Sequence, residues 1–202
     1  MFSNELDRLI IEHIADLDEG AKRLELISLK VAEEIDSLVR DWASEQEWIS
    51  GDGTWEDDGD VSVCPPSGRP DGDAWLAYFS LGYAGNDDDN WSEEKDYFWL
   101  TRLCAEGRGQ MGFRLHQSEF GKTPWKKFLS QQAGTVQNTR FVLDDLPSIF
   151  LPVKVNAQAL AAGVENETIA DALSPIREAL DHIKANWQIF DELLSNMRAR
   201  QA

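Results

Sequence analysis

The chain has 202 residues, of which 42% are hydrophobic and 10% aromatic, so it is long and apolar enough to fold around one sizeable core. Its formal net charge is −18: the first 96 residues, with 26 Asp/Glu against 7 Lys/Arg, are strongly acidic, and the remaining residues are nearly neutral. An acidic end of this kind repels phosphate, which argues against double-stranded nucleic acid as a direct partner.

Other features of the sequence favour the cytoplasm. The longest apolar runs are far shorter than the ~20 residues that span a bilayer, so no membrane partner is expected. The N-terminus lacks the basic and apolar regions of a secretory signal. Cys64 and Cys104 lie far apart in the sequence and are expected to be reduced thiols.

The N-terminal segment is predicted to be helical. Apolar residues recur at helical spacing from Leu6 to Leu17 and again from Leu24 to Trp42. Gly20 lies between the two patterns. The spacing fits either a helix pair or one long helix kinked at this glycine.

Turn-forming residues interrupt this order in residues 49–73. Glycine, proline and aspartate punctuate the whole stretch, which predicts an irregular acidic linker. A short strand is expected within it at Val61–Val63.

Period-two patterns predict a sheet in the middle of the chain. Apolar residues alternate from Trp75 to Leu81 and again from Met111 to Leu115. Between these strands, Tyr97–Cys104 is apolar on both faces, which predicts a central strand.

Three further elements follow. Thr123-Pro124 predicts the start of a short helix. Two more strands are predicted at Arg140–Leu143 and Ile149–Val155. Pro152 cannot donate to a strand ladder, so the last strand is expected at an edge of the sheet.

The C-terminal segment has the most regular pattern in the chain. Its apolar residues are spaced alternately four and three apart, at Ile176, Leu180, Ile183, Trp187, Phe190, Leu194 and Met197. Such a seam packs against another helix. It is expected to dock on the N-terminal helices of the same chain, with a homodimer through the 176–197 helix as the alternative.

These patterns predict a single α+β domain over residues 1–202. A mostly antiparallel sheet of about five strands packs against N-terminal helices and a long C-terminal helix. The expected parts are a helical N-terminal segment, an irregular acidic linker, the sheet with one short helix, and the C-terminal helices, at 1–48, 49–73, 74–155 and 156–202. The order of elements resembles that of the small acidic chaperones of secretion systems, without a shared motif.

One motif resembles that of a nuclease family. Pro70-Asp71, followed after 21 residues by Glu93-Glu94-Lys95, matches the written form of the PD-(D/E)xK signature. The resemblance implies that Asp71 and Glu93 hold Mg²⁺ and that Lys95 orients the attacking water. The chain departs from the pattern because its apolar residues follow the lysine, whereas in the family they precede it.

No other motif indicates chemistry. Gly121-Lys122-Thr123 lacks the first glycine of a phosphate-binding loop, because position 116 is His. The acidic loops at 52–60 and 87–96 lack the glycine and glutamate spacing of a calcium-binding EF-hand. No cofactor or metal site is therefore expected: the acidic loops are interpreted as solvated, with binding of a hard cation as the alternative.

Tryptophan set among acids is the more unusual feature. Trp55 and Trp91 each lie in an acidic loop. Each ring either folds back over the edge of the core or serves as an apolar anchor for a partner, with carboxylates around it that meet Arg or Lys. The candidate contact residues are Trp55, Asp57, Asp58, Asp60, Asp87, Asp88, Asp89, Trp91, Glu93 and Glu94.

The sequence favours a non-enzymatic interaction protein whose acidic end binds a basic surface of a partner protein. Inhibitors, antitoxins, immunity proteins and DNA mimics work in this way, because carboxylates imitate phosphate and steer the encounter. A divergent PD-(D/E)xK-like nuclease and a structural or secretion-chaperone-like subunit are the alternatives.

Overall fold

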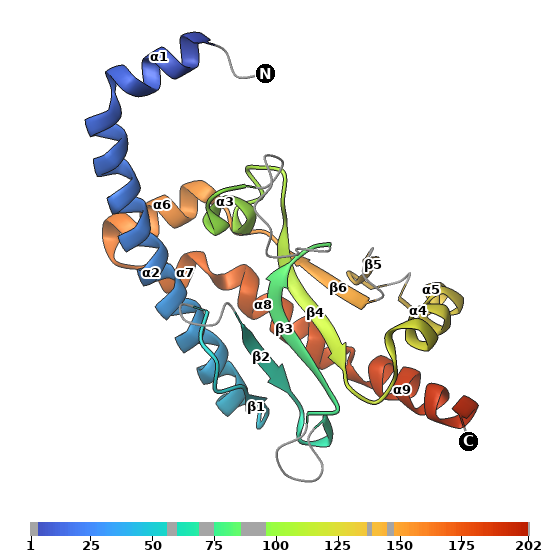
Figure 1. Cartoon of the computed structure of the whole chain (residues 1–202). Helices are drawn as coiled ribbons and strands as arrows, with labels where there is room; N and C mark the ends of the chain where they lie inside the picture. Colours follow the sequence, from blue (N-terminus) through green and yellow to red (C-terminus); the bar gives the residue numbers. More distant parts are fainter. Residues whose placement is uncertain are drawn as a thin grey trace.

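The computed structural model describes residues 4–55, 60–68, 75–85, 96–136, 139–144 and 148–201. Within these residues, helices combine with a six-stranded antiparallel sheet, which confirms the predicted α+β class (Figure 1). The strands are β1 (Ile49–Ser50), β2 (Val61–Cys64), β3 (Ala77–Tyr83), β4 (Met111–Gln117), β5 (Val142–Asp144) and β6 (Ser148–Val153). The helices are α1 (Asn4–Glu12), α2 (Ile14–Glu45), η1 (Pro66–Gly68), α3 (Trp99–Leu103), α4 (Lys122–Gln131), α5 (Ala133–Val136), α6 (Ala157–Asn166), α7 (Ile169–Ala172), α8 (Ser174–Ala185) and α9 (Trp187–Gln201).

The N-terminal helices break at His13 and not at Gly20. His13 has φ −114° and ψ 22°, outside the helical region, and it separates α1 from α2. Gly20 lies inside α2, where a single glycine is tolerated at a cost of about 1 kcal/mol relative to alanine. The kink predicted at the glycine is therefore wrong in position.

The strands follow the order β1-β2-β3-β4-β6-β5, and each neighbouring pair is antiparallel. The strand predicted around Val61 is β2. β1 and β2 both arise from the segment that was expected to be an irregular linker. Because one of the five predicted strands, Tyr97–Cys104, is a helix, the sheet has six strands in the described residues.

The central strand predicted at Tyr97–Cys104 is instead the short helix α3. Buried Leu103 of this helix follows buried Leu100 by three residues, and buried Cys104, just after the helix, follows it by four, as one face of a helix requires. Tyr97, which a central strand would bury, is 83% exposed. A short apolar run does not distinguish a strand from a buried helix by composition alone.

The edge position predicted for the strand around Pro152 is also wrong. β6 lies between β4 and β5. In the described residues, however, β5 pairs with β6 only as far as Phe150. On its other side, Pro152 is in register with Gly112 of β4. The proline therefore lies beyond the β5 pairing, where its missing N–H breaks no ladder bond on that side.

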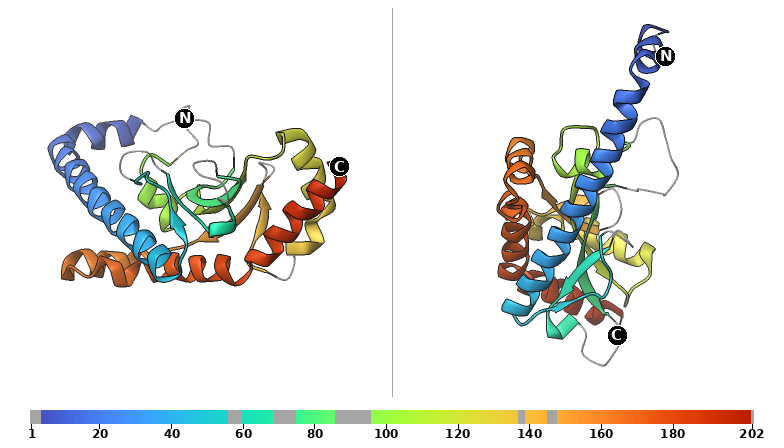
Figure 2. Two further views of the ribbon diagram at one scale, coloured as in Figure 1. Left: turned by 90° about the horizontal axis from the view of Figure 1, so that it is seen from below. Right: turned by 90° about the vertical axis from the view of Figure 1, so that its left-hand side faces the viewer.

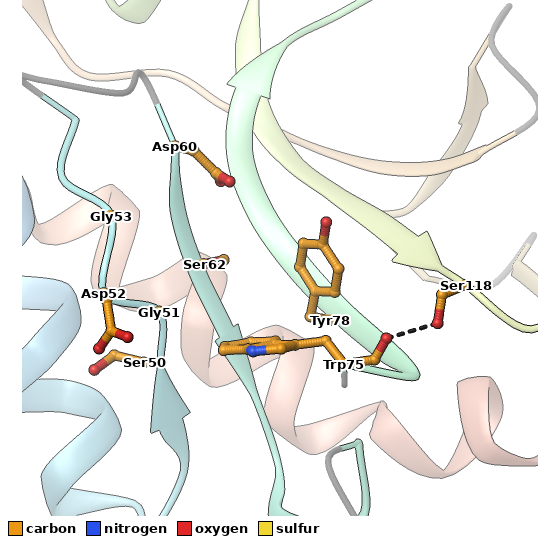
Figure 3. Close-up of a pocket in the computed structure, with 9 residues that line it drawn as sticks. All are labelled: Ser50, Gly51, Asp52, Gly53, Asp60, Ser62, Trp75, Tyr78 and Ser118. Atoms are coloured by element: carbon orange, nitrogen blue, oxygen red, sulfur yellow. Dashed lines mark hydrogen bonds between the residues drawn. The ribbon is translucent and has the colours of Figure 1, made fainter. Parts of the chain in front are cut away.

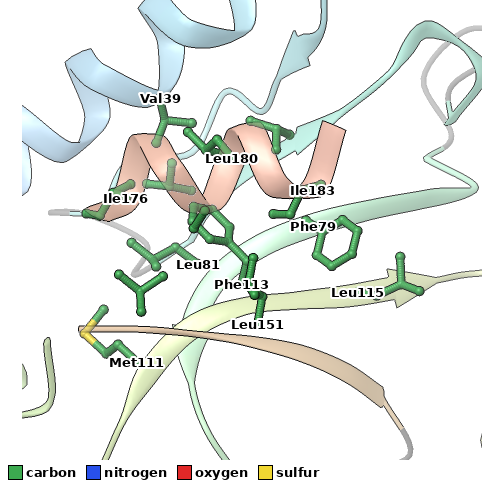
Figure 4. Close-up of a cluster of buried hydrophobic side chains, with 14 of the residues drawn as sticks. Val39, Phe79, Leu81, Met111, Phe113, Leu115, Leu151, Ile176, Leu180 and Ile183 are labelled. Atoms are coloured by element: carbon green, nitrogen blue, oxygen red, sulfur yellow. The ribbon is translucent and has the colours of Figure 1, made fainter. Parts of the chain in front are cut away.

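The core lies between one face of the sheet and helices α2, α8 and α9 (Figure 2). Phe79, Phe113 and Leu151 project from the sheet and are fully buried. They meet Val39 of α2 and Leu180 of α8 (Figure 4).

The C-terminal seam is part of this core. A break at Asn186 divides the predicted helix into α8 and α9, and every seam residue is buried within the chain, with Trp187 the most exposed at 8%. Trp42 of α2 donates its Nε1–H to Asp181 of α8 at 2.8 Å. The seam thus docks within its own chain, as expected. A homodimer through the same face stays an untested prediction.

Across β2, β3 and β4 the opposite face of the sheet carries polar side chains. Ser62, Ser80 and Arg114 lie in register across β2, β3 and β4, and Tyr78 lies opposite His116. Because side chains alternate along a strand, these residues point away from the apolar core. This polar face carries the candidate site.

Candidate functional site

A pocket of about 590 Å³ opens where β1, β2 and β3 lie side by side (Figure 3). Two carboxylates, two aromatic rings and three serine hydroxyl groups are among its lining. We call it the aromatic pocket and define it by Ser50, Asp52, Asp60, Ser62, Trp75, Tyr78 and Ser118.

A glycine sets the spacing at one side of the pocket. The N–H of Gly51 donates to the carbonyl oxygen of Ser62 at 2.9 Å, extending the pairing of β1 with β2. A Cβ on Gly51 would lie 2.5 Å from the Ser62 hydroxyl oxygen. Glycine at this position therefore lets the two segments approach and leaves room for the Ser62 hydroxyl.

The two rings are held in place by their neighbours. Trp75 meets Tyr78 edge to face, with ring centroids 5.2 Å apart. The Ser118 hydroxyl donates to the Trp75 carbonyl at 2.7 Å and fixes the backbone there. Tyr78 stacks on His116 with centroids 4.9 Å apart. The pocket is thus largely preformed, so a ligand would not have to order its walls.

The charge of the pocket is negative. Asp52 and Asp60 are both exposed, and the described lining contains no Lys or Arg. Burial, and then the negative charge of Asp60, raise the pKa of Tyr78 above its usual value, so its phenol remains a neutral donor at neutral pH. Carboxylates beside an aromatic face suit an ammonium or guanidinium group.

A serine and a histidine meet next to the pocket without forming an evident catalytic pair. The hydroxyl of Ser80 lies 2.8 Å from Nε2 of His116. Ser80 is only 7% exposed, and burial with the nearby Arg114 charge lowers the pKa of His116 to about 4. A general base works best with a pKa near the working pH, so this imidazole is a weak base at pH 7. The hydrogen bond instead joins β3 to β4.

A second acid-lined cleft of about 410 Å³ lies between α2 and the α7–α8 region. Glu34, Asp41, Glu45 and Asp171 contribute carboxylates to its lining. Arg177 also lines it and forms an ion pair with Glu45. This cleft carries its own cation and has no aromatic ring among its described lining residues, so it is the weaker candidate for a cationic ligand.

Trp55 does not serve as an exposed anchor in this structure. It is 5% exposed and makes edge contacts with Tyr83 and Trp99, at centroid distances of 5.9 and 5.5 Å. Its backbone N–H donates to the buried carboxylate of Asp36 at 2.8 Å. Covering the indole removes a large apolar area from water, so the ring closes the edge of the core.

Of the other predicted contact residues, Asp60 lines the aromatic pocket. The remaining ones, together with the residues of the nuclease-like signature, lie outside the described residues: Asp57, Asp58, Asp71, Asp87, Asp88, Asp89, Trp91, Glu93, Glu94 and Lys95.

Sequence reasoning missed the rest of the pocket. It placed Trp75 on the inward face of a strand with Phe79, but β3 begins only at Ala77. Tyr78 does follow from the alternation, because it occupies an outward position next to buried Phe79. The hydroxyl of Ser118 had no sequence signal, since it comes from a segment some 40 residues beyond Trp75.

Comparisons with known proteins found no match. No protein-family model, no curated protein and no solved structure matches the chain. Within the described part of the chain, no group of three or more His, Cys, Asp or Glu side chains is placed to hold a metal ion. Among the helices of that part, none is both long and apolar enough to cross a bilayer.

Proposed function

We propose that this chain is a non-enzymatic interaction protein that binds a basic surface of a partner protein, as inhibitors, antitoxins, immunity proteins and DNA mimics do. The aromatic pocket accepts an Arg or Lys side chain of that partner. The observation that carries the proposal is that the carboxylates of Asp52 and Asp60 line the same pocket as the rings of Trp75 and Tyr78.

The chemistry of the pocket suits this role. A guanidinium group is planar, so it can face an indole ring and also donate hydrogen bonds to a carboxylate. Serine hydroxyls accept further N–H bonds. A cavity of about 590 Å³ is larger than one side chain needs, which leaves room for part of the partner's backbone.

The surface around the pocket adds long-range attraction. Several ion pairs on α1 and α2 join residues four apart on one helix, as with Lys22 and Asp18, and Glu45 of α2 pairs with Arg177 of α8. Such pairs leave the large excess of acids in the first half of the chain in place. A field of this sign speeds association with a basic partner and weakens as salt is added.

The test is binding of a short arginine-rich peptide, with the same peptide carrying neutral citrulline in place of arginine as the ligand control. Changing both Asp52 and Asp60 to Asn should weaken binding by about 3- to 30-fold, because two exposed charged hydrogen bonds of about 0.3–1 kcal/mol each are lost. The matched control is Asp7→Asn with Glu25→Gln, which changes the net charge equally on exposed helix positions. It should weaken binding less than about 2-fold.

Two results would count against the proposal. Equal weakening in both double variants would show that only total charge matters and that the pocket is not the site. Peptide affinity that ignores citrulline replacement or added salt would remove the electrostatic basis altogether.

A further inference from the structure

The two carboxylates of the aromatic pocket occupy separate positions. Asp60 lies two residues before Ser62 on the line of β2, near enough to Tyr78 for its charge to act on the phenol. Asp52 comes from the neighbouring segment, directly after Gly51, whose N–H donates to the carbonyl oxygen of Ser62. Figure 3 accordingly shows the two carboxylates on opposite sides of Ser62. The pocket therefore offers two places for positive charge.

A single basic side chain uses only one of these places. Lysine ends in one ammonium group and arginine in one planar guanidinium group, so either side chain brings its charge to one end. Neighbouring strands lie about 4.8 Å apart, and each of the two segments carries one of the carboxylates. A ligand with an ammonium group at each end of a short stem therefore matches the pocket more fully.

The rings of the pocket suit an aliphatic stem between the two charges. Trp75 and Tyr78 meet edge to face with their planes 79° apart, so two ring surfaces at nearly a right angle border the pocket. Each methylene group that is fully buried against apolar surface strengthens binding about fourfold. A metal ion brings no methylene groups to such surfaces. The ring pair thus favours an organic cation over an inorganic one.

Serine hydroxyl groups complete the contacts of the ammonium ends. An ammonium group donates three hydrogen bonds, and hydroxyl oxygens accept them as carboxylate oxygens do. Ser62 lies between the two carboxylates. Ser118 donates its own proton to the Trp75 carbonyl at 2.7 Å and retains lone pairs that can accept from a ligand. Both ends of a linear diamine therefore find a carboxylate and further acceptors.

The size and charge of the molecule agree with a small cationic ligand. A cavity of about 590 Å³ lies in the range of small-molecule sites. The net charge of −18 raises the local concentration of cations, and it attracts a dication more strongly than a monocation.

We infer that the aromatic pocket binds a linear aliphatic diamine, with one ammonium group at Asp60, the other at Asp52 and the stem against Trp75 and Tyr78. Because the diamine occupies the place of the partner's basic side chain, it competes with the partner for the pocket. The inference rests on the cation-binding role proposed above, and it adds a small molecule that regulates that role.

The first test compares two amines with the same stem. 1,4-Diaminobutane and 1-aminobutane are titrated into the full chain at constant ionic strength, and the backbone amides of Gly51 and Ser62 are followed by NMR. A second exposed ion pair strengthens binding about 2- to 5-fold, and the two equivalent ends of the diamine add a factor of about two. The diamine should therefore bind about 4- to 10-fold more tightly than the monoamine.

Single substitutions test the two-ended contact. Asp52→Asn and Asp60→Asn should each reduce the preference for the diamine to about twofold, because only one ion pair then remains. Asp41→Asn and Asp171→Asn are the matched controls, since these exposed aspartates line the second cleft and lose the same charge. Both controls should keep the full preference.

Trp75→Ala tests the contact with the stem. The two amines share this stem, so the substitution should weaken both by the same factor, about fourfold for each methylene group that the ring covers. The preference for the diamine should stay unchanged. Trp75→Phe, which keeps an aromatic surface, should restore part of the affinity for both amines.

Competition with the arginine-rich peptide separates this inference from the proposed function. Added 1,4-diaminobutane should weaken peptide binding more than 1-aminobutane does at the same ionic strength. Peptide binding that depends on the pocket aspartates but ignores the diamine would refute the inference alone. Diamine binding in the pocket, with no binding of the peptide, would refute the proposed function alone.

Two further results would overturn the inference. The first is the absence of any shift of the pocket amides at up to about 20 mM 1,4-diaminobutane. The second is an equal loss of diamine preference in the pocket variants and in the second-cleft controls, which would show that the diamine responds to total charge only.

Discussion

Two glycines face each other on the polar side of the sheet, and alanine at each should have opposite effects. Gly82 of β3 is in register with Gly112 of β4. A Cβ on Gly112 would overlap the carbonyl oxygen of Leu151 and would lie 2.7 Å from Cζ of Phe150. A Cβ on Gly82 would meet nothing within 4 Å. Gly112→Ala should therefore destabilise the fold, whereas Gly82→Ala should not.

The magnitudes follow from what has to move. The Leu151 carbonyl belongs to the backbone of β6, which pairs with β4, so it cannot rotate away as a side chain could. Overpacking of this kind costs about 1–3 kcal/mol and sometimes more. Replacing glycine at a compatible position gains about 0.4–1 kcal/mol by restricting the unfolded chain. We expect a loss of about 2–3 kcal/mol at Gly112 and a gain of up to about 1 kcal/mol at Gly82.

Thermal unfolding of the two variants measures this difference. For a chain of about 200 residues, 1 kcal/mol shifts Tm by about 2–4 °C. Gly112→Ala should lower Tm by about 4–12 °C, and Gly82→Ala should leave it unchanged or raise it by up to about 4 °C. Equal Tm values for the two variants would refute the close approach of β6 to β4 on which the reasoning depends.

Two further predictions concern buried polar groups. Asp36→Ala should lower the free energy of unfolding, measured in urea, by about 3 kcal/mol, because the backbone N–H of Trp55 loses its buried carboxylate acceptor. The control Glu33→Ala, at an exposed position, should change it by less than about 0.5 kcal/mol. For His116 the folded pKa is about 4 against 6.5 for the free side chain, so the unfolded state takes up the proton first and stability falls as pH drops from about 6.5 to 4. His116→Gln, which can still bond Ser80, should remove up to about 3 kcal/mol of that pH dependence, and an identical pH profile in this variant would contradict the assignment.

The sequence predicted the elements whose apolar residues follow one regular period. β4 alternates cleanly, with Met111, Phe113 and Leu115 buried, and its position was confirmed. The C-terminal seam was likewise placed correctly, since every one of its residues is buried. In both cases the period of the apolar residues shows which side of the element faces the core. This period is the same whichever helix or strand packs against that side.

Elements with buried residues on several sides were harder to predict. Trp99 and Leu100 suggested a strand because both faces of the run are apolar, yet α3 is a helix that is short enough to bury most of its surface. The position predicted for the helix break was wrong for another reason. Because glycine weakens any helix, the break was predicted at Gly20. His13 gives no such signal in the sequence, and the break there is visible only in its backbone conformation.

The aromatic pocket lay beyond sequence reasoning because its chemistry is assembled from four separate segments. Ser50–Gly53, Asp60–Ser62, Trp75–Tyr78 and Ser118 become neighbours only through the registers of β1, β2, β3 and β4. The sequence did predict an association of tryptophan with carboxylates, but the prediction placed it within one loop, around Trp55. In the described structure that indole is buried in the core, and the interaction of ring and acid is made by Tyr78 of β3 and Asp60, which precedes β2. Proximity in sequence predicts contact in a helix, where neighbours lie three or four residues apart. In an antiparallel sheet the contacts follow the pairing of strands, so a site on its face has no compact signature in the chain.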